Sequence, residues 1–143
     1  MMDISLINRK IALLVQAKKE LEGYGVKSLT AFERDRRDQK AVQKILQEMV
    51  EICMDMGKHI IADEGFRFPE DSRDIFTVLG ENAVISEKTM MMMHKMVGFR
   101  NILVHLYEKI DLEIVYGIYK KRLDDFDSFV SEVNSFMNKR AKS

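Results

Sequence analysis

Apolar side chains recur every three or four residues along most of this chain, and this spacing matches the turn of an α-helix. Two clear runs are Ile4, Ile7, Ile11, Leu14 and Leu21, and then Val42, Ile45, Met49, Ile52, Met56 and Ile60. A single proline and seven glycines among 143 residues leave long stretches without a helix breaker. The sequence therefore predicts an all-α fold.

The first half of the chain predicts two long helices. One covers residues 4–22 and ends at Gly23, and the other covers about residues 35–61, with Gly65 marking its exit. Residues 63–71 are expected to form a loop, and Ser72 to cap a short helix that ends at Gly80.

The second half predicts two more long helices. Ser86 is the expected N-cap of one, whose apolar stripe consists of Met92, Met96, Phe99, Leu103 and Leu106. Asp111 is the expected cap of a last, uninterrupted helix that reaches Met137. We expect an antiparallel four-helix bundle with an additional short helix, formed by residues 1–143 as one domain with a flexible tail over residues 138–143.

Charge and cysteine content narrow the possible environments and partners. The formal net charge is zero, so a strong overall positive field is not available to coat nucleic acid, and any RNA contact must be local. Cys53 is the only cysteine and has no intramolecular partner for a disulfide. No apolar run approaches the roughly 20 residues that a membrane-spanning helix needs. We therefore expect a cytoplasmic protein that does not contact membranes.

The most informative motif lies within residues 100–107. Arg100 supplies a guanidinium, which can hold phosphate oxygens with a fixed fork of donors, and His105 supplies an imidazole, which can exchange a proton near neutral pH. RNA cleavage needs both roles. Asn101 lies one helical turn before His105 on the same face, while Tyr107 adds a phenol. If the helix persists, seven-residue spacing lets Arg100 meet Tyr107 directly.

Each of these residues also has a structural interpretation. At the end of its helix, His105 could satisfy a backbone carbonyl or interact favourably with the helix dipole. Arg100 could pair with a carboxylate of another helix, and Tyr107 could lie at the bundle edge with its hydroxyl in water. The remaining histidines, His59 and His94, have no partner at metal-ligand spacing. We expect neither a metal nor a cofactor.

The segment from Val97 to Tyr107, with Ile110–Asp111 and Val115–Tyr116 after it, resembles the HepT-like branch of the HEPN superfamily. Arg100, His105 and Tyr107 fit that branch's Arg-x4-His-x-Tyr motif without a gap. The resemblance implies catalytic roles for Arg100 and His105. Asn101, on the same helix face as His105, is expected to support them.

The same resemblance implies a metal-independent endoribonuclease toxin of a type VII toxin-antitoxin system. Its substrate would be tRNA or mRNA, cleaved in the cleft of a homodimer. Its partner would be a minimal nucleotidyltransferase antitoxin that transfers AMP to Tyr107. Two alternatives stay open: a non-catalytic helical subunit that binds nucleotide or RNA in a nucleotidyltransferase complex, and a purely structural bundle.

Overall fold

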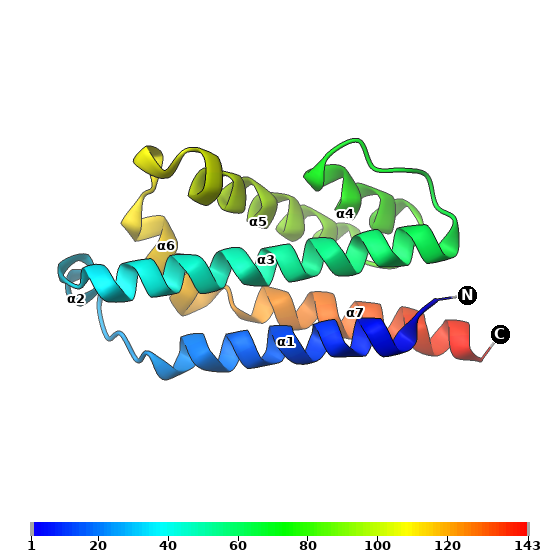
Figure 1. The fold of residues 1–143 in the computed structure, drawn as a ribbon, viewed down its shortest axis with the longest axis horizontal. Helices are drawn as coiled ribbons and strands as arrows, with labels where there is room; N and C mark the ends of the chain where they lie inside the picture. The colour runs from blue at the N-terminus through cyan, green and yellow to red at the C-terminus, as the bar shows by residue number, and fades with distance from the viewer. Residues whose placement is uncertain (1, 143) are drawn as a thin grey trace.

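The computed structural model describes residues 2–142, and these residues form helices and connecting segments without a strand. Its long helices are α1 (Ile4–Gly23), α3 (Arg36–Glu64), α5 (Glu87–His105) and α7 (Asp124–Ala141). Figure 1 shows that α1 and α5 run in one direction and α3 and α7 in the opposite direction. Contacts join α1 to α3, α3 to α5 and α5 to α7. The predicted all-α antiparallel four-helix bundle is confirmed.

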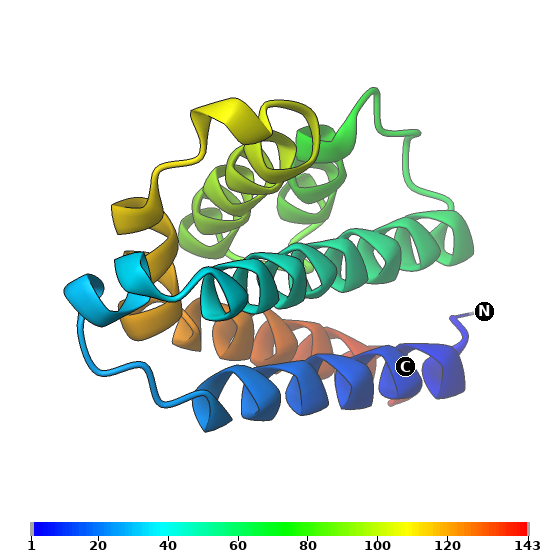
Figure 2. The same ribbon diagram turned by 60° about the vertical axis from the view of Figure 1, so that its left-hand side comes forward.

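Four shorter helices complete the fold. They are α2 (Leu29–Arg34), α4 (Ser72–Glu81), the 3-10 helix η1 (Tyr107–Lys109) and α6 (Leu112–Lys121). The predicted short helix is α4, which packs against α3 and α5 on the same side of the bundle (Figures 1 and 2). At one end of the molecule α2 contacts α3 and α6. The sequence did not predict α2.

The prediction of one uninterrupted last helix was wrong, because the chain bends between α6 and α7 at Arg122 and Leu123. The bend lets α6 reach α2 and the segment before it, where the Tyr119 hydroxyl accepts a hydrogen bond from the Val26 N–H at 3.1 Å. Helix dipoles favour the break as well, since the basic last turn of α6 precedes the acidic first turn of α7. The apolar period continues through the bend, so periodicity alone could not reveal it.

Side-chain caps mark the starts of the α-helices from α1 to α6, whereas α7 begins after Leu123 without one. Ser86 and Asp111 cap α5 and α6 as predicted, each through its side-chain oxygen. For α4 the cap is Asp71 instead of Ser72, since the Asp71 carboxylate accepts from the N–H of Asp74 at 2.8 Å. Gly65 ends α3 with a φ of 70° in the left-handed region that favours glycine, as its place after the helix predicts.

Apolar side chains from every long helix form the core. Phe76 of α4 and Phe129 of α7 meet edge to face, with their ring centroids 5.7 Å apart. The stripe predicted for α5 was partly wrong. Leu106 is 44% exposed because it lies beyond the last helical residue, and Met93 and Val97 are buried in the core.

At the C-terminus α7 continues to Ala141, so most of the expected tail over residues 138–143 is helical, while Ser143 lies outside the described residues.

Candidate functional site

Arg100 is fixed against α3 by an ion pair. Its Nε and Nη2 atoms donate to Glu51 Oε2 at 3.0 and 2.8 Å, and its Nη1 atom donates to Asn101 Oδ1 at 3.1 Å. Gln47 donates to the same Glu51 oxygen at 3.3 Å. The structural interpretation of Arg100, an ion pair with a carboxylate from another helix, is therefore realised. A guanidinium has five N–H donors, so two remain for a phosphate.

His105 is the last helical residue of α5, and its side chain is exposed. Within residues 2–142 its imidazole has no hydrogen-bond or ion-pair partner, so it does not satisfy a backbone carbonyl as the structural interpretation suggested. The helix period places it one turn beyond Asn101 and about 7.5 Å along the axis from Arg100. An imidazole in this position is free to exchange a proton with a bound substrate.

Tyr107 does not continue the motif helix. The helix stops at His105, Leu106 leaves helical geometry with φ −132° and ψ 42°, and Tyr107 begins η1. The expected helical contact between Arg100 and Tyr107 is therefore absent from the described structure. The non-helical backbone at Leu106 takes Tyr107 off the helix face that it would share with Arg100. The Tyr107 side chain is 72% exposed and lines a groove of about 410 Å³ between α3 and the start of α6.

A polar stripe along α3 connects the surroundings of Arg100 to those of Tyr107. Its members recur at steps of three or four residues and are Arg36, Lys40, Gln43, Gln47 and Glu51. Glu51 and Gln47 hold Arg100, while Arg36, Lys40 and Gln43 line the groove at Tyr107. Sequence reasoning found the apolar stripe of this helix and missed the polar one. The helical spacing of the polar residues was the available signal, but it did not indicate which helix would pack against the polar stripe.

Arg73 of α4 is another residue that sequence reasoning missed. Its Nε atom donates to the His94 carbonyl at 3.3 Å, and its Nη2 atom lies 2.5 Å from where a Cβ at Gly98 would be. The space that Gly98 leaves is thus occupied by a guanidinium. His94, Gly98 and His105 share one face of α5, so Arg73 adds a cation to the strip that ends at His105. The His94 ring itself bonds the Thr77 hydroxyl at 2.8 Å.

A sequence model of the ribonuclease HepT-like family matches residues 14–133. The chain belongs to the ribonuclease HepT-like family. Among its relatives, the mRNA nuclease HepT of Shewanella oneidensis is 34% identical over 131 residues, which cover 91% of this chain and 97% of that protein. The tRNA nuclease HepT of Aphanizomenon flos-aquae is 23% identical over 133 residues, covering 87% and 90% of the two chains.

Solved toxin-antitoxin structures contain chains with the same fold. One chain of a toxin-antitoxin crystal structure with AMP-PNP gives a TM-score of 0.86 at 33% identity, covering 92% of this chain and 98% of its own length. The tri-AMPylated HEPN toxin of Shewanella oneidensis, in complex with its MNT antitoxin, gives 0.85 at 33% identity and covers 94% and 99%. The predicted resemblance to the HepT-like branch is therefore confirmed.

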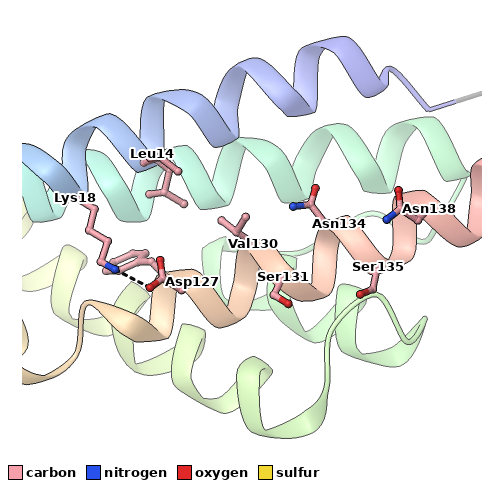
Figure 3. A pocket seen from close by; sticks show the side chains of 10 residues that line it. Leu14, Lys18, Asp127, Val130, Ser131, Asn134, Ser135 and Asn138 are labelled. Atoms are coloured by element: carbon pink, nitrogen blue, oxygen red, sulfur yellow. Dashed lines mark hydrogen bonds and ion pairs between the residues drawn. The ribbon is translucent and has the colours of Figure 1, made fainter.

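Other parts of this HepT-like chain lie apart from the motif. A hollow of about 410 Å³ between α1 and α7 is lined largely by polar residues of α7 and is crossed at one end by a 2.6 Å ion pair from Lys18 to Asp127 (Figure 3). Within residues 2–142 no three His, Cys, Asp or Glu side chains gather as a metal site. None of the helices in that range combines the length and the apolar character that a membrane-spanning segment needs.

Proposed function

We propose that this HepT-like protein is a metal-independent endoribonuclease, the toxin of a toxin-antitoxin pair, with Arg100 and His105 as its catalytic residues. The observation that carries the proposal is the pairing of a fixed guanidinium with an exposed imidazole one to two turns along α5. Relatives that align over nearly the whole chain carry the names mRNA nuclease and tRNA nuclease. RNA is the substrate class, and the cytoplasm is where we place the encounter.

The reaction we assign is an internal transesterification of RNA. A base removes the proton of the ribose 2′-hydroxyl, and the 2′-oxygen attacks the adjacent phosphorus. The bond from phosphorus to the 5′-oxygen breaks, and an acid protonates that oxygen as it leaves, so a cyclic phosphate and a 5′-hydroxyl result. His105 exchanges these protons, and the two unused donors of Arg100 stabilise the charge on the phosphorane. Asn101 supports Arg100 through the bond to Nη1.

A homodimer completes this site. One imidazole cannot easily be base and acid in the same step, so we propose that His105 and Arg100 of two protomers meet in one cleft, the two-fold cleft. Exposed apolar residues at the end of α5 support this arrangement, because Ile102 on the helix and Leu106 directly after it are 36% and 44% exposed.

A nucleotidyltransferase antitoxin is the partner that neutralises the toxin. The solved relatives at 33% identity include a toxin-antitoxin complex with an ATP analogue and a tri-AMPylated toxin. On this chain we assign the modification to Tyr107, whose phenol is exposed. The phenol oxygen would attack the α-phosphorus of ATP, pyrophosphate would leave, and the phenol proton would pass to solvent. The added AMP carries negative charge and bulk into the RNA-binding region.

The test compares RNA cleavage by wild type, His105→Ala and His59→Ala in the presence of a chelator. His59 is a matched control, since it lies on α3 and pairs with Asp55 at 3.6 Å, away from the motif. We expect wild type and His59→Ala to cut, and His105→Ala to be slower by about 10²- to 10⁴-fold, the usual contribution of a general acid or base.

Intact mass must first show that Tyr107 is unmodified in all three proteins. If folded wild type binds the antitoxin and never cuts RNA, the protein is a non-catalytic binding subunit and the nuclease proposal fails. Equal cleavage by wild type and His105→Ala would retain a nuclease and remove His105 from its chemistry.

A further inference from the structure

The groove beside Tyr107 has one cationic wall and one apolar wall. Arg36 and Lys40 lie one turn apart on α3, are exposed, and have no ion-pair or hydrogen-bond partner within residues 2–142. The opposite wall consists of Leu103, Ile110 and Leu112. No carboxylate is among the lining residues, so the charged side chains that line the groove are both positive.

Two glutamine side chains line the groove, and only one of them is already hydrogen-bonded within the protein. Gln39 donates its Nε2 protons to the carbonyls of Phe32 at 2.9 Å and Glu33 at 3.1 Å, so it anchors α2 to α3. Gln43 is half-buried and has no side-chain partner among the described residues. An open amide beside two cations can bind a phosphate oxygen or the polar edge of a base.

We propose that this groove is a nucleotide-binding subsite that receives the AMP group carried by Tyr107. Arg36 and Lys40 bind its phosphate, and the adenine lies against Leu103, Ile110 and Leu112. The inference rests on the proposed function, in which Tyr107 is AMPylated. It differs from the helical contact expected between Arg100 and Tyr107, which would place Arg100 beside the new phosphate.

The contacts of Arg100 decide this assignment. Bonds to Glu51 and Asn101 hold its guanidinium against α3 and leave two donors open, but the break at Leu106 removes Tyr107 from its helical stripe. Lys40 and Glu51 are separated by about 16 Å along the axis of α3. A phosphate attached to the phenol therefore lies in the groove with Lys40 and Arg36, where the tether keeps its local concentration high.

A groove of about 410 Å³ lies within the range of roughly 300–1,000 Å³ that ligand pockets have. Seating AMP there would tie η1 to α3 and hold the segment that follows His105 in one position. Inhibition would then come from an ordered nucleotide at the edge of the cleavage site, with its negative charge already balanced by α3.

The experiment compares wild type with Arg36→Ala/Lys40→Ala and with the control Arg37→Ala/Lys44→Ala. Both control residues are exposed cations of α3 that do not line the groove. Each protein is coexpressed with the nucleotidyltransferase antitoxin, AMP on Tyr107 is verified by peptide mass, and the rate at which a phosphodiesterase releases it is measured.

We expect release from the groove variant to be on the order of tenfold faster than from wild type, since hydrogen bonds to a charged phosphate are lost. The control variant should match wild type, and Lys40→Arg should keep most of the protection. Added salt should speed release from wild type and leave the groove variant unchanged. Equal release rates in all variants would overturn the subsite and leave the modification intact.

The remaining outcomes also decide. If wild type copurifies with the antitoxin and never gains AMP on Tyr107, the modification and the subsite both fail, while the nuclease assay stays independent of them. If all variants copurify with the antitoxin and only the groove variant gains no AMP, the two cations hold the phosphate during transfer, which supports the subsite. If the groove variant no longer copurifies with the antitoxin, Arg36 and Lys40 bind that protein instead and the subsite is overturned.

Discussion

At the scale of single residues, two helical glycines lie close to side chains of α4, with opposite consequences for an added methyl group. A Cβ at Gly57 would be 2.5 Å from Ile75 Cγ2 and 3.3 Å from Leu79 Cδ1, both in the core. A Cβ at Gly98 would meet only the far end of the Arg73 side chain. The first neighbour cannot move without disturbing the packing between α3 and α4, and the second can swing into solvent.

We predict that Gly57→Ala destabilises the protein by about 1–2 kcal/mol, because overpacking outweighs the gain in helix propensity. Gly98→Ala should be neutral or stabilising by up to about 1 kcal/mol, since helix propensity acts without a core clash. It should nevertheless weaken RNA binding on the order of tenfold, because it displaces the Arg73 guanidinium.

Denaturant unfolding and RNA titration measure the two effects separately, with Arg73→Ala as the comparison for binding. Unchanged RNA binding in Gly98→Ala would show that Arg73 does not contact the substrate.

The candidate site shows what sequence supplies at this scale. Arg100, Asn101, His105 and Tyr107 could be singled out because they lie within eight consecutive residues of the sequence, and their roles in cleavage and modification remain predictions. Glu51 could not be matched to Arg100, since the two are 49 residues apart and many carboxylates were available. Only the packing of α3 against α5 selects the partner.

At the scale of elements, periodicity predicted the long helices and capping residues predicted several of their starts. It could not find the bend between α6 and α7, because Val115, Tyr119, Leu123 and Phe126 are buried on both sides of the break at helical spacing. Nor could it place η1, where the chain leaves the helix one residue before Tyr107. The bend accompanies contacts of α6 with α2 and α3 that local sequence does not specify.

The loop before α4 is held by one arginine. Arg67 donates to both carboxylate oxygens of Asp74 at 2.7 and 2.8 Å and to those of Glu81 at 2.9 Å. These hydrogen bonds from Arg67, with one from the Glu70 N–H, lower the pKa of Asp74 to about 2. Hydrogen bonds from Arg67 also lower the pKa of Glu81.

A lowered carboxyl pKa in the folded state stabilises that state above the unfolded-state pKa of roughly 4, and the contribution disappears as the pH falls toward 2. We therefore predict that Arg67→Ala lowers the melting temperature at pH 7, and that the difference from wild type shrinks between about pH 4 and pH 2. Thermal unfolding followed by circular dichroism measures this, with the exposed Arg34→Ala on α2 as control. A difference that stays constant down to pH 2 would contradict the role of the two carboxylates.

At the scale of the whole molecule, the bundle covers α5 from three sides and leaves one face open. Contacts with α3, α4 and α7 bury Met93, Met96 and Val97. Met91 and Ile102 remain 53% and 36% exposed on the outward face that leads to His105. An apolar face next to an unpartnered imidazole suits an interface in which a second copy completes the two-fold cleft.

We predict that Ile102→Glu converts a wild-type dimer into a monomer, because it places two like charges opposite each other across the two-fold axis. Stability of the monomer should change by no more than about 0.5 kcal/mol, since the residue is solvent-exposed. Cleavage should fall by at least about 10²-fold, because each imidazole loses the partner that supplies the second proton transfer. The control Ile114→Glu changes a residue of α6 that is 55% exposed. This variant should keep the sedimenting mass of the dimer and the RNA cleavage activity of wild type. Sedimentation and RNA cleavage at equal concentrations measure the two properties, and a monomeric Ile102→Glu protein with full activity would mean that one protomer holds the complete site.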